Sequence, residues 1–92
     1  MPDEKLARAI RSRIRREMLH ILNRNGPTSV HEFTERLHTT ESSASKHLKL
    51  LYDLGFLDFE ERPPEKFYFL KFKEIGELFR IYDSIVERMK NQ

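Results

Sequence analysis

The sequence contains no cysteine, only three glycines and no long apolar run. Without cysteine the chain can form no disulfide and offers no thiolate to a metal or a substrate. A membrane-spanning helix needs about 18 consecutive apolar residues, and no segment approaches that length. The acidic start, Met1 to Glu4, is not followed by the apolar segment of a secretory signal. These absences predict a cytoplasmic protein that does not enter a membrane.

Motifs of catalysis are missing as well. The 92 residues contain no glycine-rich phosphate loop, no His-Glu-x-x-His motif and no nucleophile elbow. A domain of this size with so few glycines would have to form any substrate cleft between subunits. We therefore expect no enzymatic activity and no cofactor.

Positive charge is concentrated near the N-terminus. Residues 5–16 carry six cations and no acid, although the net charge of the whole chain is only +2. Residues 1–54 hold ten Lys and Arg against seven Asp and Glu, whereas residues 55–92 hold seven against eight. This distribution permits nucleic-acid binding, although a solvated helix face would give the same pattern.

Apolar residues recur at helical spacing through the first 54 residues. Residues 3–24 are expected to form two consecutive helices, with Ser12 as the N-cap of the second. After the stop at Gly26 and Pro27, residues 29–54 read as a helix-turn-helix whose second helix spans 41–54.

After Gly55 the pattern alternates, as in strands. Residues 56–61 and 66–72 are expected to pair as a β-hairpin, with a turn at 62–65 because two prolines cannot lie inside a strand. Residues 73–91 return to helical spacing and carry more apolar surface than a lone terminal helix needs, which predicts a partner helix.

This order of elements predicts a mainly α protein with a small β-hairpin, a winged helix-turn-helix with an additional C-terminal dimerisation helix, in a single domain over residues 1–92. The stretch from Glu41 to Leu57, ESSASKHLKLLYDLGFL, resembles the signature of ArsR-type regulators of bacteria and archaea. Their recognition helix typically reads Ser-x-x-Ser-x-His-Leu-x-x-Leu and runs into a Gly-Leu that opens the wing. The segment from Ile14 to Leu22 is similar to the helix before that motif. The resemblance covers roughly residues 9–72.

The recognition helix has short polar and cationic residues where a helix in the major groove needs them. With Ala44, Leu48 and Leu51 turned inward, we expect Ser43 and Lys46 to read base edges. Phosphate contacts are expected from other residues of the helix and from its N-terminus. The DNA-contacting set predicted in this helix is Ser42, Ser43, Ser45, Lys46, His47 and Lys49.

Some of the predicted contacts have a competing interpretation. His47 lies next to the inward face and is at least as compatible with packing between helices. Arg15 and Arg16, with Arg13, either approach the DNA backbone or pair with acids of the terminal helix such as Glu74 and Glu77.

The wing departs from the ArsR pattern, in which the tip carries Arg, Lys and Gly. Its tip here holds four acids against two cations, Arg62 and Lys66. Arg62 is retained as a DNA contact, but the acids favour a protein partner at the wing as an alternative.

Metal sensing is the commonest activity of ArsR-type proteins, and this sequence does not carry the ligands for it. The thiolate site requires cysteines, and His31 to Leu37 contains none. The site on the terminal helices requires histidine, and residues 73–92 contain none; Asp83 and Glu87 alone suit zinc poorly. We expect no bound metal, and expect these two acids to face water or pair with Arg80 and Arg88.

The resemblance therefore implies a homodimeric transcriptional repressor that binds a pseudo-palindromic operator on double-stranded DNA. The alternative is a winged-helix protein-interaction or assembly module that uses the acidic wing as its contact surface. The expected dimer interface consists of Leu6, Ile10, Ile75, Leu78, Phe79, Tyr82, Ile85, Val86 and Met89.

Overall fold

The structure is a computed structural model that describes residues 2–91. Its N-terminal half holds four helices: α1 (Pro2–Arg11), α2 (Arg13–Asn25), α3 (Val30–Leu37) and α4 (Glu41–Asp53). The predicted break at Ser12 is confirmed, and α4 ends one residue earlier than expected.

Local hydrogen bonds explain where these helices begin. The side chains of Ser12, Ser29 and Thr40 each accept a hydrogen bond from the backbone N–H three residues ahead, at the first turns of α2, α3 and α4. Such N-caps satisfy donors that the helix itself leaves unpaired. Between α3 and α4, His38 adopts φ 52°, in the left-handed region, and its N–H bonds to the carbonyl of Thr34. This conformation ends α3 and lets the chain turn into α4.

The wing is a hairpin of β2 (Leu57–Arg62) and β3 (Glu65–Leu70). A third strand that the sequence analysis did not predict, β1 (Thr28–Ser29), pairs with the other edge of β3, giving the order β1-β3-β2. The predicted four-residue turn was too long, because Arg62 and Glu65 face each other as the last pair of the ladder. Only the two prolines between them form the turn.

The core is centred on α2, which packs against α4, α5 (Lys73–Lys90) and the sheet. Met18, Leu19 and Leu22 of α2 belong to one buried cluster with residues of α1, α3, α4, the sheet and α5. Where α5 crosses α2, the side chain of Asn23 occupies the space that a Cβ at Gly76 would need. The first turns of α5 are thereby fastened to the winged helix.

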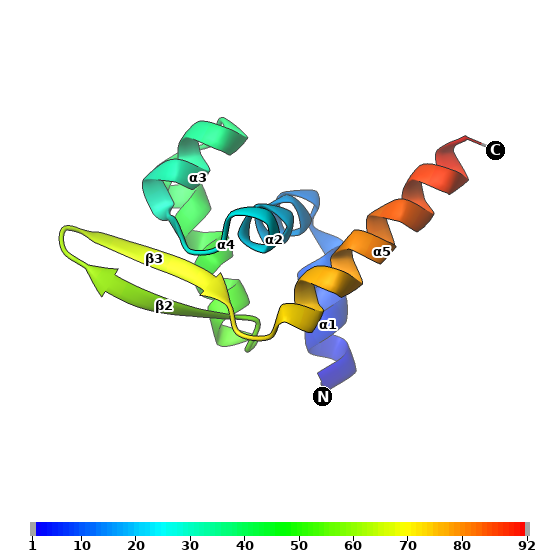
Figure 1. Cartoon of the computed structure of the whole chain (residues 1–92), viewed down its shortest axis with the longest axis horizontal. Coiled ribbons are helices and arrows are strands. Elements are labelled where there is room, and N and C mark those ends of the chain that lie inside the picture. The colour runs from blue at the N-terminus through cyan, green and yellow to red at the C-terminus, as the bar shows by residue number, and fades with distance from the viewer. Residues whose placement is uncertain (1, 92) are drawn as a thin grey trace.

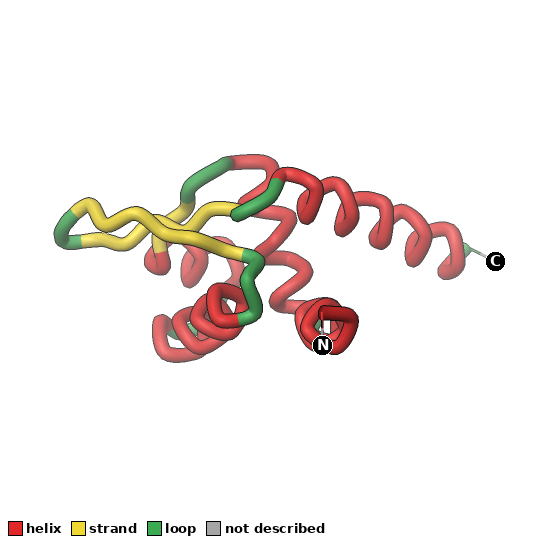
Figure 2. The backbone as a smooth tube through the Cα atoms, turned by 90° about the horizontal axis from the view of Figure 1, so that it is seen from below, coloured by secondary structure: helices red, strands yellow, loops and turns green. Residues whose placement is uncertain are grey.

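The wing and α5 extend in opposite directions from this core (Figure 1). Their extension makes the molecule 47 Å long and 21 Å thick. The view from below shows that the last turns of α5 project beyond all the other elements (Figure 2). Among residues 2–91, no helix is both long and apolar enough to span a membrane.

The apolar surface of α5 consists of two adjacent stripes rather than the single one that the sequence predicted. Ile75 and Phe79 are buried in the protomer's own core, and Tyr82 and Val86 are half-buried along the same line. The first two are therefore unavailable to a partner, contrary to the prediction. The second stripe is exposed and consists of Leu78, Ile81, Ile85 and Met89.

Candidate nucleic-acid interface

The outer face of α4 presents a row of polar side chains. Ser42, Lys46 and Lys49 are all exposed and stand at intervals of four and three residues, so they share one line along the helix. We call these three residues the outer row. Ser45 is also exposed, on the side of α4 that faces the wing.

Ser43 does not share this exposure. Its side chain is half-buried, and its backbone N–H donates to the hydroxyl of Thr40 at 3.1 Å. The most accessible residues of α4 are therefore those of the outer row, and not the predicted pair of Ser43 and Lys46.

On the opposite side from the wing, α4 contacts α2 through Arg15 and His47. A guanidinium nitrogen of Arg15 lies 3.3 Å from Nδ1 of His47, and another donates to the carbonyl oxygen of Arg8 at 2.7 Å. Because arginine only donates hydrogen bonds, Nδ1 of His47 must accept, which places the ring proton on Nε2. His47 is therefore packed between helices, as one of its two alternatives expected, with Arg15 rather than the backbone as its partner. DNA contact by His47 stays a prediction.

Both partners of this contact have lowered pKa values. Burial lowers the pKa of Arg15, and the nearby charges of Arg8 and Arg11 lower it further. Burial likewise lowers the pKa of His47 below 6.5, and the charge of Arg15 adds to the effect. The imidazole is therefore held in its neutral form, as the hydrogen bond from Arg15 requires.

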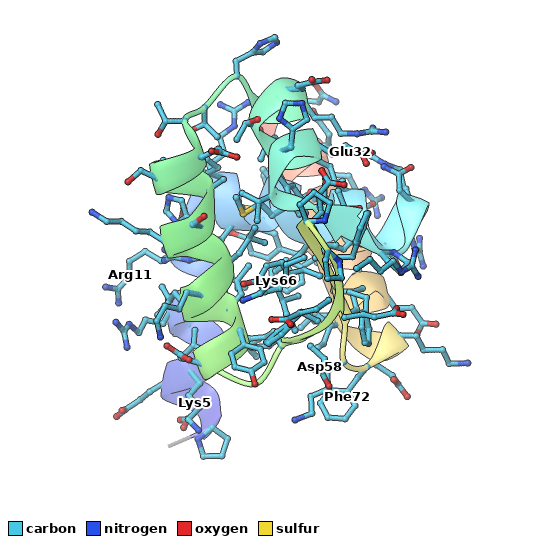
Figure 3. The ribbon with its side chains drawn as sticks, turned by 90° about the vertical axis from the view of Figure 1, so that its left-hand side faces the viewer. Lys5, Arg11, Glu32, Asp58, Lys66 and Phe72 are labelled. Carbon is cyan, nitrogen blue, oxygen red and sulfur yellow. The ribbon has the colours of Figure 1, made fainter. Side chains whose placement is uncertain are left out.

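Arg8 and Arg11 are candidate phosphate contacts that the sequence analysis did not single out. They belong to the cationic run of residues 5–16, but only their proximity to Arg15 connects them with α4. Figure 3 shows Arg11 on one side of α4 and Lys66 on the other, between α4 and the hairpin. We call Arg8, Arg11, Arg15 and His47 the basic flank.

The other arginines at the start of α2 are engaged within the protomer. Arg16 donates to the carbonyl oxygen of Ile10 and lies over the ring of Tyr82, 5.4 Å from its centre. Arg13 is exposed and pairs with Glu17 of the same helix at 3.3 Å. Neither of them pairs with Glu74 or Glu77, so that alternative was wrong.

The wing side of α4 is acidic by contrast. Lys49 of the outer row pairs with Asp53 at 3.1 Å. Arg62, the predicted wing contact, pairs with Glu60 at 3.1 Å and lies over the ring of Phe67. Both cations are exposed, but each already has an acid beside it.

Aromatic rings join the wing to α4. The ring of Phe59 lies between those of Tyr52 and Tyr68, with centre-to-centre distances of 5.2 and 5.7 Å. Tyr68 is buried, and this burial raises the pKa of its hydroxyl, although the charge of Lys49 opposes the shift. These tilted ring contacts hold the base of the wing against the C-terminal half of α4.

The described residues do not fit a metal site. Asp83 of α5 is hydrogen-bonded to Nε2 of His20 of α2, whereas the sequence suggested that it faces water or pairs with Arg80 and Arg88. Within residues 2–91, no three His, Asp or Glu side chains come together in a way that could hold an ion.

Comparison with known proteins shows to which family this winged helix belongs. The model of the family described as bacterial regulatory protein, arsR family, matches residues 12–58, about half of the chain, from the N-cap of α2 into β2. The chain belongs to the ArsR family. It therefore has the DNA-binding winged-helix fold of this family of transcription regulators, whose members are generally not enzymes.

Solved ArsR-like structures superpose on most of the chain. Reduced HlyU of Vibrio cholerae is 25% identical, with a TM-score of 0.81 over 91% of this chain and 87% of its own. The homodimeric winged helix-turn-helix DNA-binding domain of Mb0332 from Mycobacterium bovis is 16% identical, with a TM-score of 0.83 over 94% and 79%.

The antimony-specific transcriptional repressor AntR is 18% identical, with a TM-score of 0.81 over 95% of this chain and 78% of that one. Among curated proteins, none matches the sequence. The structural neighbours confirm the predicted winged helix-turn-helix with a C-terminal helix.

Proposed function

We propose that the chain is a homodimeric, sequence-specific repressor of transcription that reads a pseudo-palindromic operator with α4 and acts in the cytoplasm. The outer row of α4 is the observation that carries this proposal. Ser42, Lys46 and Lys49 are exposed along one line of a helix whose other face is buried in the core. Hydroxyl and ammonium groups at such positions can hydrogen-bond to base edges and phosphates of the major groove.

The basic flank supports the phosphate contacts. Arg8 and Arg11 lie close enough to Arg15 to lower its pKa, so several positive charges gather beside α4. A phosphate oxygen placed there would relieve the repulsion among these guanidinium groups, which makes DNA binding electrostatically favourable. Nε2–H of His47 is a further donor on this flank.

The exposed stripe of α5 supports a homodimer. Leu78, Ile81, Ile85 and Met89 leave between 44% and 66% of their surface exposed, on a helix that projects from the body. Their spacing of three, four and four residues is that of a helix-pairing seam. Leu6 and Ile10 of α1, both half-buried, contribute the edge of this interface. The homodimeric fold of Mb0332 is consistent with this arrangement.

A twofold dimer places two copies of α4 on one face, where they read half-sites one helical turn of DNA apart, about 34 Å. Occupancy of a promoter by this dimer blocks the polymerase. The repressor role is supported by the likeness to AntR, which is a transcriptional repressor.

Fluorescence anisotropy on the gene's own upstream DNA, with a shuffled control and titrated through salt, tests the DNA-binding proposal. We expect a preference for the upstream DNA of about a thousandfold and a steep fall of affinity with salt. Equal binding to both sequences would replace the specific repressor with an architectural protein.

The dimer is tested separately by sedimentation. Ile85→Glu places a charge in the exposed stripe and is expected to give monomers, whereas Ser84→Glu, exposed about 100° around α5 from Ile85 and outside the stripe, should leave the dimer intact. A dimeric Ile85→Glu variant would show that this stripe is not the interface.

The acidic wing supports one alternative, a protein-interaction module. Asp58, Glu60, Glu61 and Glu65 are exposed there. Absence of binding to either DNA at moderate salt would favour this alternative over the repressor.

A further inference from the structure

A cavity of about 580 Å³ lies between α4, the wing and the start of α3. Its volume falls within the range of small-molecule sites in proteins, about 300 to 1,000 Å³. The cavity borders the outer row, because Ser45 and Lys49 of α4 form part of its wall. Any occupant would therefore lie beside the proposed DNA-contacting surface.

The charges of the cavity are unfavourable for a phosphate backbone. Glu41, Asp53 and Glu65 line it, together with Lys49 and Lys66. Asp53 neutralises Lys49 at 3.1 Å. Among residues 2–91, neither Glu41 nor Glu65 forms an ion pair, and Lys66 is the only lysine or arginine of the lining besides Lys49, so carboxylates outnumber these cations by three to two. DNA binding alone does not account for these acids.

The remaining lining includes the aromatic residues Tyr52, Phe59 and Tyr68, and one of these rings already holds an ammonium group. Nζ of Lys66 lies 4.3 Å from the centre of the Phe59 ring, a cation–π contact inside the cavity. The ring of Tyr52 lines the same space and is 41% exposed. A second cation would find an open aromatic face and an excess of carboxylates within one cavity. Figure 3 shows Lys66 between α4 and the hairpin.

We propose that this cavity binds an organic cation, an amine or quaternary ammonium group on an apolar body, and that this cation competes with DNA. The carboxylates of Glu41 and Glu65 attract the charge, and the rings of Tyr52 and Phe59 cover the apolar body. The competition rests on the proposed function, since it requires DNA to approach Ser45 and Lys49. The cavity and its ligand class do not depend on that function.

Binding is tested first without DNA, by titrating the ¹⁵N-labelled chain with benzyltrimethylammonium and following amide shifts. We expect saturable shifts at Ser45, Tyr52, Phe59 and Glu65. Benzoate and benzyl alcohol carry the same ring with a negative or no charge, and neither should produce these shifts. Absence of saturable shifts with the cation, or equal binding of benzyl alcohol, would overturn the proposed ligand class.

Matched variants test the role of the carboxylates. The double variant Glu41→Gln/Glu65→Gln should weaken binding of the cation about tenfold. The control Glu61→Gln/Glu77→Gln removes two exposed acids outside the cavity and should leave binding unchanged. Equal weakening by both double variants would mean that only the overall charge of the protein matters, and would contradict a specific site in the cavity.

Competition is measured by DNA anisotropy at constant ionic strength with and without saturating benzyltrimethylammonium. The cation should weaken DNA binding by the unmodified protein several-fold, and DNA binding by the Glu41→Gln/Glu65→Gln variant much less. Unchanged DNA affinity in the presence of bound cation would overturn the competition. A chain that binds the cation and no DNA would refute the proposed function while leaving the cavity's ligand class intact.

Discussion

The outer row of α4 and the tip of the wing are neighbouring exposed surfaces with opposite charge patterns. The outer row carries two lysines and a serine, and its nearest acid, Asp53, lies at the C-terminal end of the helix. The wing from Leu57 to Leu70 carries four acids and two cations. Under the proposed function, affinity for DNA is therefore expected to be concentrated in α4, because the acidic wing repels a polyanion.

The largest effect is expected at Lys46, the cation of the outer row for which the structure of residues 2–91 records no acidic partner. Lys46→Ala should weaken binding to the upstream DNA about 10- to 100-fold, because one contact to a base edge or phosphate is lost. Anisotropy titrations measure this loss. Lys90→Ala, at the far end of α5, is the control and should bind normally; equal losses in both variants would remove the special role of α4.

A smaller effect of opposite sign is expected at Asp53. Asp53→Asn releases Lys49 from its ion pair and removes a charge that repels phosphate, so DNA affinity should rise about three- to fivefold at low salt. The gain should shrink as salt is added. Glu77→Gln, an exposed acid of α5, serves as control. Unchanged affinity of Asp53→Asn would mean that Lys49 does not contact DNA.

The wing should contribute less than either site. Arg62 is held by Glu60 and by the ring of Phe67, and Arg62→Ala should change DNA affinity by less than about twofold. The same anisotropy assay applies. A loss of tenfold or more would place the wing among the principal DNA contacts and break the comparison.

The smallest effect concerns the stability of the basic flank at low pH. Because the pKa of His47 in the folded chain lies below 6.5, the unfolded chain binds a proton more readily over the range just below that value. Folding stability should therefore fall as pH is lowered through this range. At neutral pH and above neither state binds this proton, so the destabilisation is absent there.

The measurement is the urea midpoint at pH 7.5 and at pH 5.5, for the natural sequence and for His47→Gln. The variant cannot take up this proton, so its midpoint should fall less on acidification. Other groups titrate equally in both chains and cancel in the difference. Identical falls would contradict a linked protonation of His47.

Local features of the fold could be predicted from the sequence, because the residues that cause them are neighbours in the chain. The N-caps at Ser12 and Thr40 lie within three residues of the N–H groups that they accept. The exposed serines and lysines of α4 follow from helical spacing alone.

Contacts between distant residues could not be predicted in this way. Nothing local to Arg15 indicates that it meets His47, 32 residues away, or that His20 meets Asp83 across 63 residues. For the same reason the sequence analysis assigned the apolar residues of α5 to a single interface, because helical spacing does not tell which of them face α2. The pairing of β1 with β3 depends on how the whole chain folds back.

That short pairing separates how the wing is held from what the wing contacts. Ser29 caps α3 and is also the ladder partner of Phe67, so the middle of β3 is fastened to the helix-turn-helix. The tip beyond Glu60 carries none of the core. Residues of the tip can therefore be exchanged, or the turn between Arg62 and Glu65 lengthened, without removing a core contact. New tip sequences offer a route to engineer other specificities on the same fold.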